Sequence, residues 1–184
     1  MLKILRSAAF IAATVLAAQS TLITVVIETS AGVIEVAVDP VYAPLTTANF
    51  LRYVDAGMYD GGRFHRAVRR DNQARQDVII EVIQGGRDPA SAKTTRGFGP
   101  IPLERTAVTT LTHVDGAISM ARGTAADSAS SDFFLCVGPQ PALDFGGARA
   151  ADGQGFAAFG PGHEGHERGA PHPGGPHQRA RAAD

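Results

Sequence analysis

The sequence has no tryptophan, a single cysteine and almost no net charge. Its 17 lysines and arginines are balanced by 18 aspartates and glutamates, which leaves a formal net charge of −1. Such a balance argues against the partners that attract basic proteins, namely nucleic acids and anionic membranes. Cys136 stands alone in an apolar stretch, so it cannot form an internal disulfide and is expected to be a buried, inert thiol.

Long hydrophobic runs are also scarce, and the longest lies near the N-terminus. Lys3 and Arg6 precede an alanine-rich segment from Ser7 to Ala18, which is shorter than the ~20 residues needed to span a bilayer. Small residues follow, as at a signal-peptidase site. We therefore expect residues 1–19 to be a cleaved signal peptide, and the mature chain to be periplasmic or secreted and free of the membrane.

What is present suits one turn-rich β domain, since the chain is 44% hydrophobic and contains 21 glycines. Residues 22–29 and 33–38 are rich in β-branched side chains and flank a Ser-Ala-Gly turn signal, so they predict an antiparallel hairpin. Residues 44–56 begin with proline and are followed by Gly57, which predicts a helix.

Further short apolar segments along the chain predict more strands. They cover residues 63–68, 78–84, 117–121, 133–137 and 156–159. Many short strands and one helix favour a closed β-barrel that the helix plugs at one end. The predicted fold class is therefore mainly β.

Three of these segments are informative together. Residues 62–66 contain Phe64-His65-Arg66, residues 82–86 read Val-Ile-Gln-Gly-Gly, and residues 131–136 contain a pair of phenylalanines. In this order they resemble the cyclophilin family of peptidyl-prolyl cis/trans isomerases.

The resemblance extends from about residue 25 to residue 160, so we expect a cyclophilin-like domain over residues 20–160. It implies an eight-stranded antiparallel barrel closed by helices. A polar insertion at residues 70–77 and a loop at residues 145–155 are similar to the bacterial exported branch. The family's activity implies an isomerase that uses no cofactor and no metal, and that acts on proline-containing polypeptides.

The chemistry of X–Pro rotation explains why such residues suit the reaction. The barrier of about 18–20 kcal/mol arises from conjugation between the amide nitrogen and its carbonyl. A rigid, permanently charged donor can favour localising the lone pair on the prolyl nitrogen, and a guanidinium has that character. The resemblance makes Arg66 this catalytic donor, with Gln84 holding the substrate backbone and orienting the guanidinium.

An apolar pocket must hold the proline ring while the carbonyl swings. The residues expected to form it are Phe64, Val82, Phe134, Leu143 and Phe156. Ala121 and Arg122 are expected to present backbone groups to the residues before the proline. Taken singly, the phenylalanines would be read as core residues and Arg66 as a solvated strand residue; the ordered combination favours a site.

The chain departs from the family at the pocket wall. Phe156 stands where many members have histidine, Ala142 where many have tryptophan, and Glu81 where a phenylalanine is common. In eukaryotic members that tryptophan contributes to cyclosporin binding, so weak cyclosporin binding is expected here.

The sequence changes character after Gly160. Residues 161–184 hold four of the six histidines and no large apolar side chain, so they predict a disordered tail in place of the family's second helix and last strand. A frameshift in the gene is one hypothesis for this replacement, and resequencing around the Gly160 codon would test it. Losing a strand would expose a sheet edge and weaken a fold of only about 5–15 kcal/mol.

Two other readings stay open at this point. The chain could be a non-catalytic module or chaperone that binds proline peptides, or an inactive truncated product, and in either case a monomer is expected. A metal site in the tail is disfavoured, because its His-Glu-Gly-His spacing lacks a residue compared with helical zinc motifs. The histidines concerned are His163, His166, His172 and His177.

Overall fold

The computed structural model describes residues 22–161 and 178–181. These residues contain eight strands: β1 (Ile23–Thr29), β2 (Gly32–Val38), β3 (Arg63–Val68), β4 (Val82–Gly86), β5 (Ile118–Met120), β6 (Phe133–Cys136), β7 (Ala157–Gly160) and β8 (Gln178–Arg181). The helical elements are α1 (Pro44–Asp55), the short helices α2 (Pro89–Thr94) and α3 (Thr106–Thr109), and the 3-10 turns η1 (Ala126–Ser128) and η2 (Pro141–Leu143). The predicted mainly β fold, the first hairpin and the proline-initiated helix are all confirmed.

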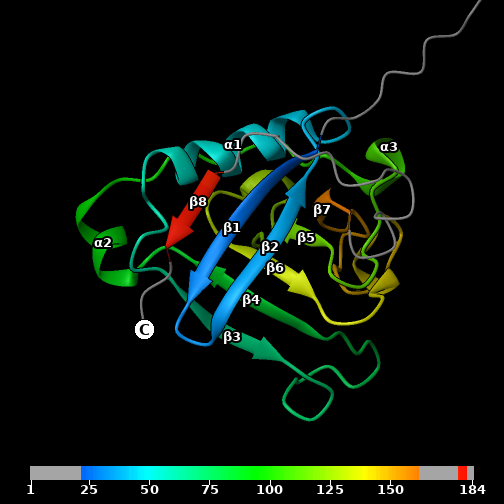
Figure 1. The fold of residues 1–184 in the computed structure, drawn as a ribbon. Coiled ribbons are helices and arrows are strands. Elements are labelled where there is room, and N and C mark those ends of the chain that lie inside the picture. The colour runs from blue at the N-terminus through cyan, green and yellow to red at the C-terminus, as the bar shows by residue number, and fades with distance from the viewer. Residues whose placement is uncertain (1–21, 162–177, 182–184) are drawn as a thin grey trace, which may run out of the picture.

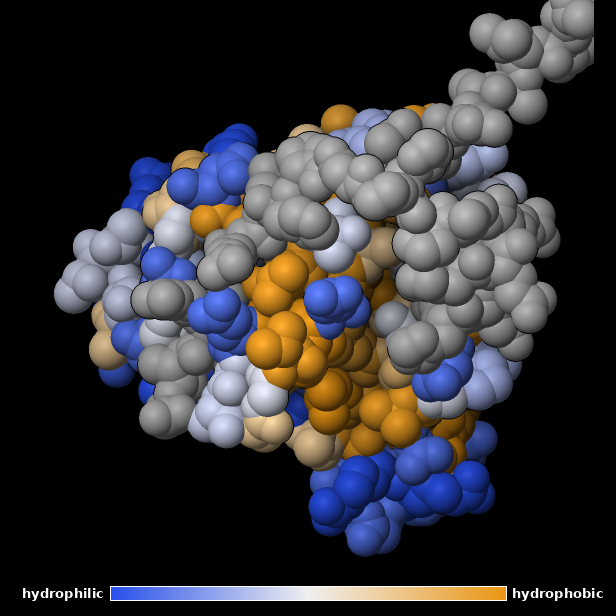
Figure 2. All heavy atoms as spheres, viewed as in Figure 1, coloured by the Kyte–Doolittle hydropathy of each residue, from blue (hydrophilic) through white to orange (hydrophobic). Residues whose placement is uncertain are grey.

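The strands form two sheets with the main core between them. One sheet has the order β2-β1-β8 and the other β3-β4-β6-β5-β7, and every pairing is antiparallel except that of β1 with β8. Helix α1 lies across one end of both sheets (Figure 1). On the face that carries β1 and β2, apolar residues gather over the middle and hydrophilic residues border them (Figure 2).

Among the described residues the hydrogen-bonded ladders form two sheets, and no ladder that joins all eight strands into the expected closed barrel is detected. The sheets do meet at one seam, where Asp39 N donates to Phe159 O at 2.8 Å. A Cβ on Gly160 would overlap the carbonyl oxygen of Ala37 at this seam, so only glycine allows the approach.

Helix α1 fills the end of the core with aromatic side chains. Phe50 contacts Tyr59, Phe133 and Phe159 with ring centroids 5.4, 5.5 and 5.2 Å apart. The first turn of the helix is capped by a distant carboxylate, since Glu104 accepts hydrogen bonds from the backbone N–H groups of Leu45 and Thr46. Leu45 and Glu104 are 59 residues apart in the sequence, so no local pattern predicts this cap.

The C-terminal region differs from the expectation of a tail without a last strand. Residues 178–181 form β8, which pairs in parallel with Val25–Glu28 of β1. The pairing needs only backbone donors and acceptors, so the edge of β1 can be covered without apolar side chains on the covering strand. Residues 162–177, where a second helix would fall, lie outside the described residues, as do the tail histidines and the predicted signal peptide.

Within residues 22–161 and 178–181, none of the helices has the length and apolar character that crossing a bilayer requires.

Candidate functional site

The registers of the five-stranded sheet place three of the predicted site residues in one row. Arg66 of β3 pairs with Gln84 of β4, and Gln84 pairs with Phe134 of β6. Residues opposite one another on neighbouring strands project from the same face. Val82, two residues before Gln84, shares that face as well. The face concerned is turned away from the main core between the two sheets.

Phe64 does not share this face, so its assignment to the proline pocket is wrong. The register shifts between Phe64 and Arg66, because the bulge at His65 adds one residue to β3. Phe64 therefore pairs with Gly85 instead of a residue in the Gln84 row. Its ring packs edge-on against Phe133 at 6.0 Å in the main core.

A chain of polar contacts orients the exposed guanidinium of Arg66. Its Nη1 donates to Gln84 Oε1 at 3.4 Å, and Gln84 Nε2 donates to Asp132 Oδ2 at 3.5 Å. His65 Nε2 lies 3.7 Å from the same carboxylate oxygen. A carboxylate only accepts hydrogen bonds, so Asp132 directs the NH2 end of the amide toward itself and the oxygen toward Arg66. Sequence analysis missed Asp132, although it directly precedes the paired phenylalanines.

The apolar part of the site is a buried cluster beside this polar chain. Phe134 and Leu143 are 4% and 1% exposed, and Val82 is 4% exposed. The half-buried Phe156 meets Phe134 edge-on, with ring centroids 5.7 Å apart. The structure thus brings Val82, Phe134, Leu143 and Phe156 together as an apolar floor next to Arg66 and Gln84.

A buried polar triad supports the floor from below. His113 Nδ1 lies 2.7 Å from Asp144 Oδ1, and His113 Nε2 lies 2.9 Å from Ser119 Oγ. The imidazole stacks on Phe134 at 5.9 Å with an interplanar angle of 14°. The combination resembles a hydrolytic triad, but Ser119 is 0% exposed, so no substrate can reach its hydroxyl. Asp144 lies 25 residues or more from His113 and Ser119 in the sequence, and the three residues form no motif that would predict the triad.

The side chain of Arg122 is buried beside the 145–155 loop, while the role expected of its backbone stays a prediction. Its side chain, 3% exposed, donates to Gly155 O at 2.8 Å and pairs with Asp152 Oδ1 at 2.7 Å. Its guanidinium also lies 5.1 Å from the centroid of the Phe156 ring. Arg122 therefore fixes residues 145–155 against the floor. The N–H of Ala121 donates to Asp132 O at 2.8 Å, so of its backbone groups the carbonyl is the one left for the predicted contact with substrate.

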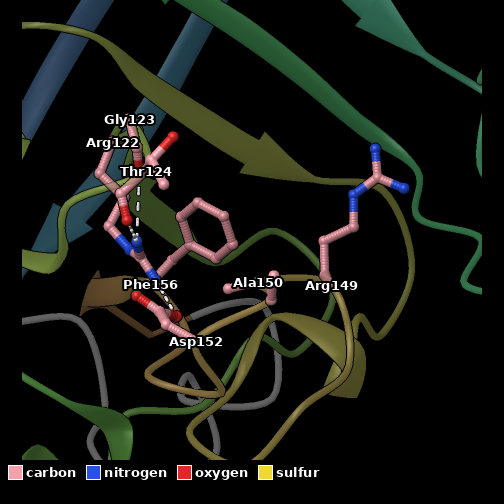
Figure 3. A pocket seen from close by; sticks show the side chains of 8 residues that line it. Arg122, Gly123, Thr124, Arg149, Ala150, Asp152 and Phe156 are labelled. Carbon is pink, nitrogen blue, oxygen red and sulfur yellow. Dashed lines mark hydrogen bonds and ion pairs between the residues drawn. The ribbon is translucent and has the colours of Figure 1, made fainter.

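A cavity of about 260 Å³ opens between this loop and the floor. Its lining residues are Arg122, Gly123, Thr124, Arg149, Ala150, Ala151, Asp152 and Phe156. The Phe156 ring faces Ala150 across the gap, and the Arg149 side chain extends from the far wall (Figure 3).

The loop at 145–155 is also fastened to the polar insertion between β3 and β4. Arg75 Nη1 donates to the carbonyl oxygens of Ala148 and Arg149, at 3.0 and 3.2 Å. Arg149 Nη1 donates in return to Gln73 Oε1 at 3.1 Å and to Val78 O at 3.0 Å. The two insertions therefore form one wall of the site. No group of three or more His, Cys, Asp or Glu side chains in the described parts of the chain is arranged to hold a metal.

A protein-family model described as "Cyclophilin type peptidyl-prolyl cis-trans isomerase/CLD" matches residues 24–167. The chain is a cyclophilin. It is 37% identical over 122 residues to peptidyl-prolyl cis-trans isomerase A of Dickeya dadantii, covering 66% of this chain and 58% of the relative. It is 34% identical over 137 residues to isomerase cyp18 of Streptomyces antibioticus, covering 74% and 75%. This cyclophilin thus spans little more than half of the first relative's length.

Solved structures agree on the fold of this cyclophilin. A cyclophilin-type isomerase of Cryptosporidium parvum gives a TM-score of 0.58 at 22% identity, covering 80% of this chain and 81% of that one. Cyclophilin AquaCyp293 of Hirschia baltica gives 0.56 at 19% identity, covering 80% and 67%. The Cryptosporidium protein was also crystallised in the presence of the dipeptide Ala-Pro, a structure that gives a TM-score of 0.53.

Proposed function

We propose that this cyclophilin is a peptidyl-prolyl cis/trans isomerase that rotates X–Pro bonds, with Arg66 as its catalytic residue. The observation that carries the proposal is the row formed by Arg66, Gln84 and Phe134, which sets a cation beside an apolar floor on one sheet face. The similarity to isomerases and the match to the family model support the same reaction.

The geometry suits each requirement of the reaction. The proline ring rests on the floor of Val82, Phe134, Leu143 and Phe156. Arg66 donates a hydrogen bond toward the prolyl nitrogen as its lone pair localises, which favours the twisted amide over both planar isomers. Gln84 keeps the guanidinium in place. The step moves no proton and breaks no bond, so a donor that never ionises is sufficient.

The test is an NMR exchange measurement on an X–Pro peptide with the chain from Gln19 onward. Replacing Arg66 by alanine should lower the catalysed exchange rate by about 100-fold, as when one preorganised donor is removed from an active site. Arg63→Ala is the matched control, because Arg63 lies on the same strand and pairs with Asp88 at the surface. It should leave the rate unchanged.

Two results would count against catalysis. Equal rates for the wild type and Arg66→Ala would remove the arginine from the mechanism. Peptide binding without any acceleration, from a chain whose circular dichroism shows it folded, would favour the non-catalytic proline-binding module.

The proposal extends to the cellular role. We place the mature chain in the periplasm or outside the cell, where it assists the folding of exported proteins as a monomer, on the strength of the leader-like residues 1–19. Fractionation of cells expressing the full chain tests the location, and a cytoplasmic product of full length would contradict it.

Weak inhibition by cyclosporin is a further expectation. Ala142 offers no indole to the inhibitor, and the neighbouring wall is built from Arg149, whose N–H donates to Ala142 O at 3.0 Å. Inhibition should therefore require micromolar or higher concentrations. The same exchange assay with increasing cyclosporin measures it, and half-inhibition at nanomolar inhibitor would refute the expectation.

A further inference from the structure

The cavity beside Phe156 has one guanidinium whose charge is not neutralised within it. Arg122 and Asp152, both in its lining, form an ion pair at 2.7 Å and cancel each other. Arg149, also in the lining, contacts only neutral oxygens, those of the Gln73 amide and the Val78 backbone. The lining therefore carries a single net positive charge, at Arg149.

Arg149 also has donors to spare. Both of its hydrogen bonds leave from Nη1, so within the described residues Nη2 and Nε have no partner. A guanidinium presents its donors in a fixed fork, and one edge of that fork is a matched pair for a carboxylate. The Nη1 bonds to Gln73 and Val78 hold the head group in place, so the free edge is positioned before a ligand arrives.

The surroundings of Arg149 are positive as well. Burial lowers the pKa of Arg149, the cations Arg66 and Arg75 lower it further, and the carboxylate of Asp77 has a smaller opposing effect. Arg75 is itself paired with Asp77 at 2.7 Å, which leaves Arg66 and Arg149 as the cations that face the site without a carboxylate bonded to them. A carboxylate entering here would be attracted by both.

We propose that this cavity is a specificity subsite for an acidic side chain flanking the substrate proline, with Arg149 as the residue that binds it. The inference rests on the proposed isomerase function for its substrate, and adds the class of sequence that the site prefers. The cavity adjoins Phe156 of the apolar floor, so a peptide whose proline rests on that floor brings a neighbouring side chain to it. Glutamate has a carboxylate on a flexible side chain, and its two oxygens can accept the hydrogen bonds that the free edge of Arg149 donates.

The experiment compares proline peptides that differ only in Glu or Gln beside the proline, in one series before it and in another after it. Binding is measured by NMR titration and does not depend on turnover. Glu should bind about two- to fivefold tighter than Gln in one series, the range for a partly exposed ion pair. The preference should shrink as salt rises, because screening weakens such pairs.

Variants assign the preference to one residue. Arg149→Gln should abolish the Glu-over-Gln ratio, and Arg149→Lys should keep part of it. Arg70→Gln, which removes an exposed charge from the polar insertion, is the control and should leave the ratio intact. A merely structural role of Arg149 would weaken both peptides equally and leave their ratio unchanged.

Different outcomes test the acidic subsite and the isomerase activity. Equal binding of Glu and Gln peptides by the wild type in both series overturns the subsite, as does a preference that survives Arg149→Gln. Loss of isomerisation on an Ala-Pro peptide is a different result: it removes the proposed reaction, whereas a Glu preference in binding would still assign the subsite.

Discussion

At the scale of single residues, the bulge at His65 decides which side chains belong to the site. Strict alternation predicts that Phe64 and Arg66 share a face, and the sequence offers no sign that β3 gains a residue between them. The residue that pairs with Phe64 is Gly85, and a Cβ there would lie 2.9 Å from the Phe64 ring. Glycine at this position therefore makes room for a phenylalanine in the core. The family resemblance singled out Arg66 and Gln84, and the strand pairing places them opposite one another, whereas the face of Phe64 depends on register.

Asp132 provides a prediction about orientation. Asp132→Asn replaces a group that only accepts hydrogen bonds by one that can also donate. Residue 132 then no longer fixes the orientation of the Gln84 amide, whose oxygen accepts from Arg66. We expect the isomerisation rate to fall up to about tenfold, equivalent to one hydrogen bond of about 0.5–1.5 kcal/mol. Exchange spectroscopy on an X–Pro peptide measures it.

The matched control is Asp71→Asn, which removes the negative charge from an exposed pair with Arg69. It should not change the rate. An Asp132→Asn enzyme as fast as the wild type would show that Gln84 is held by other means.

Cys136 supplies a pH prediction. Burial raises the pKa of its thiol to about 12, above the ~8.5 of an exposed cysteine, so the folded state favours the protonated form. The stabilisation is complete below the unfolded pKa and is lost as pH rises from about 8.5 toward the folded value. Urea unfolding between pH 7 and 10 should show a decline in stability that is smaller in Cys136→Ala. Identical slopes in both proteins would contradict the assignment.

At the scale of elements, the wall of the site is made by two segments that sequence analysis identified separately. The polar insertion and the 145–155 loop were each visible in the sequence, but the bonds that join Arg75 to Ala148 and Arg149 to Gln73 span more than 70 residues. No local pattern encodes contacts at that separation. The polar composition of residues 70–77 predicts a solvated loop, but Gln73 within it is only 8% exposed.

Gln73 should therefore be the residue on which the insertion depends. Its amide donates to Arg69 O and Ile80 O and accepts from Ile80 N and Arg149. Gln73→Ala leaves buried backbone groups without partners, at a cost of about 1–3 kcal/mol in the free energy of unfolding. Urea denaturation checks the value.

Gln76→Ala is the appropriate comparison, since Gln76 lies three residues away, is exposed and makes one hydrogen bond, to Gln73 O. It should cost less than about 0.5 kcal/mol, as surface substitutions usually do. Equal losses in the two variants would mean that the amide of Gln73 is not what holds the insertion.

At the scale of the whole molecule, the strand segments and the plugging helix could be predicted from the sequence, and the way in which the two sheets meet could not. Hydrophobic alternation and turn residues locate the strands, but which edges meet depends on contacts such as Asp39 with Phe159. The last strand was hidden for another reason. The sequence of Gln178–Arg181 has no pattern of a buried strand, and its pairing with β1 uses backbone groups.

Strand β8 makes a prediction about association. A chain ending at His177 lacks β8 and leaves the backbone groups of Val25–Glu28 without a neighbour on that side. Open edges pair with other chains, so this variant should form dimers or larger species at concentrations where the full chain does not. Sedimentation velocity would measure it, with a chain ending at Arg181 as the control. Two monodisperse monomers would show that β8 is dispensable for covering the edge.

The hydrogen bonds that join the polar insertion to the 145–155 loop also limit how the two segments can change in evolution. A chimera that takes the segment around Gln73 from another cyclophilin, but keeps its own 145–155 loop, would bury donors and acceptors with nothing to meet them. The segments should accordingly be gained, lost and exchanged as a pair, although they are far apart in the sequence. Anyone grafting the acidic-peptide preference inferred for Arg149 onto a relative would have to move both.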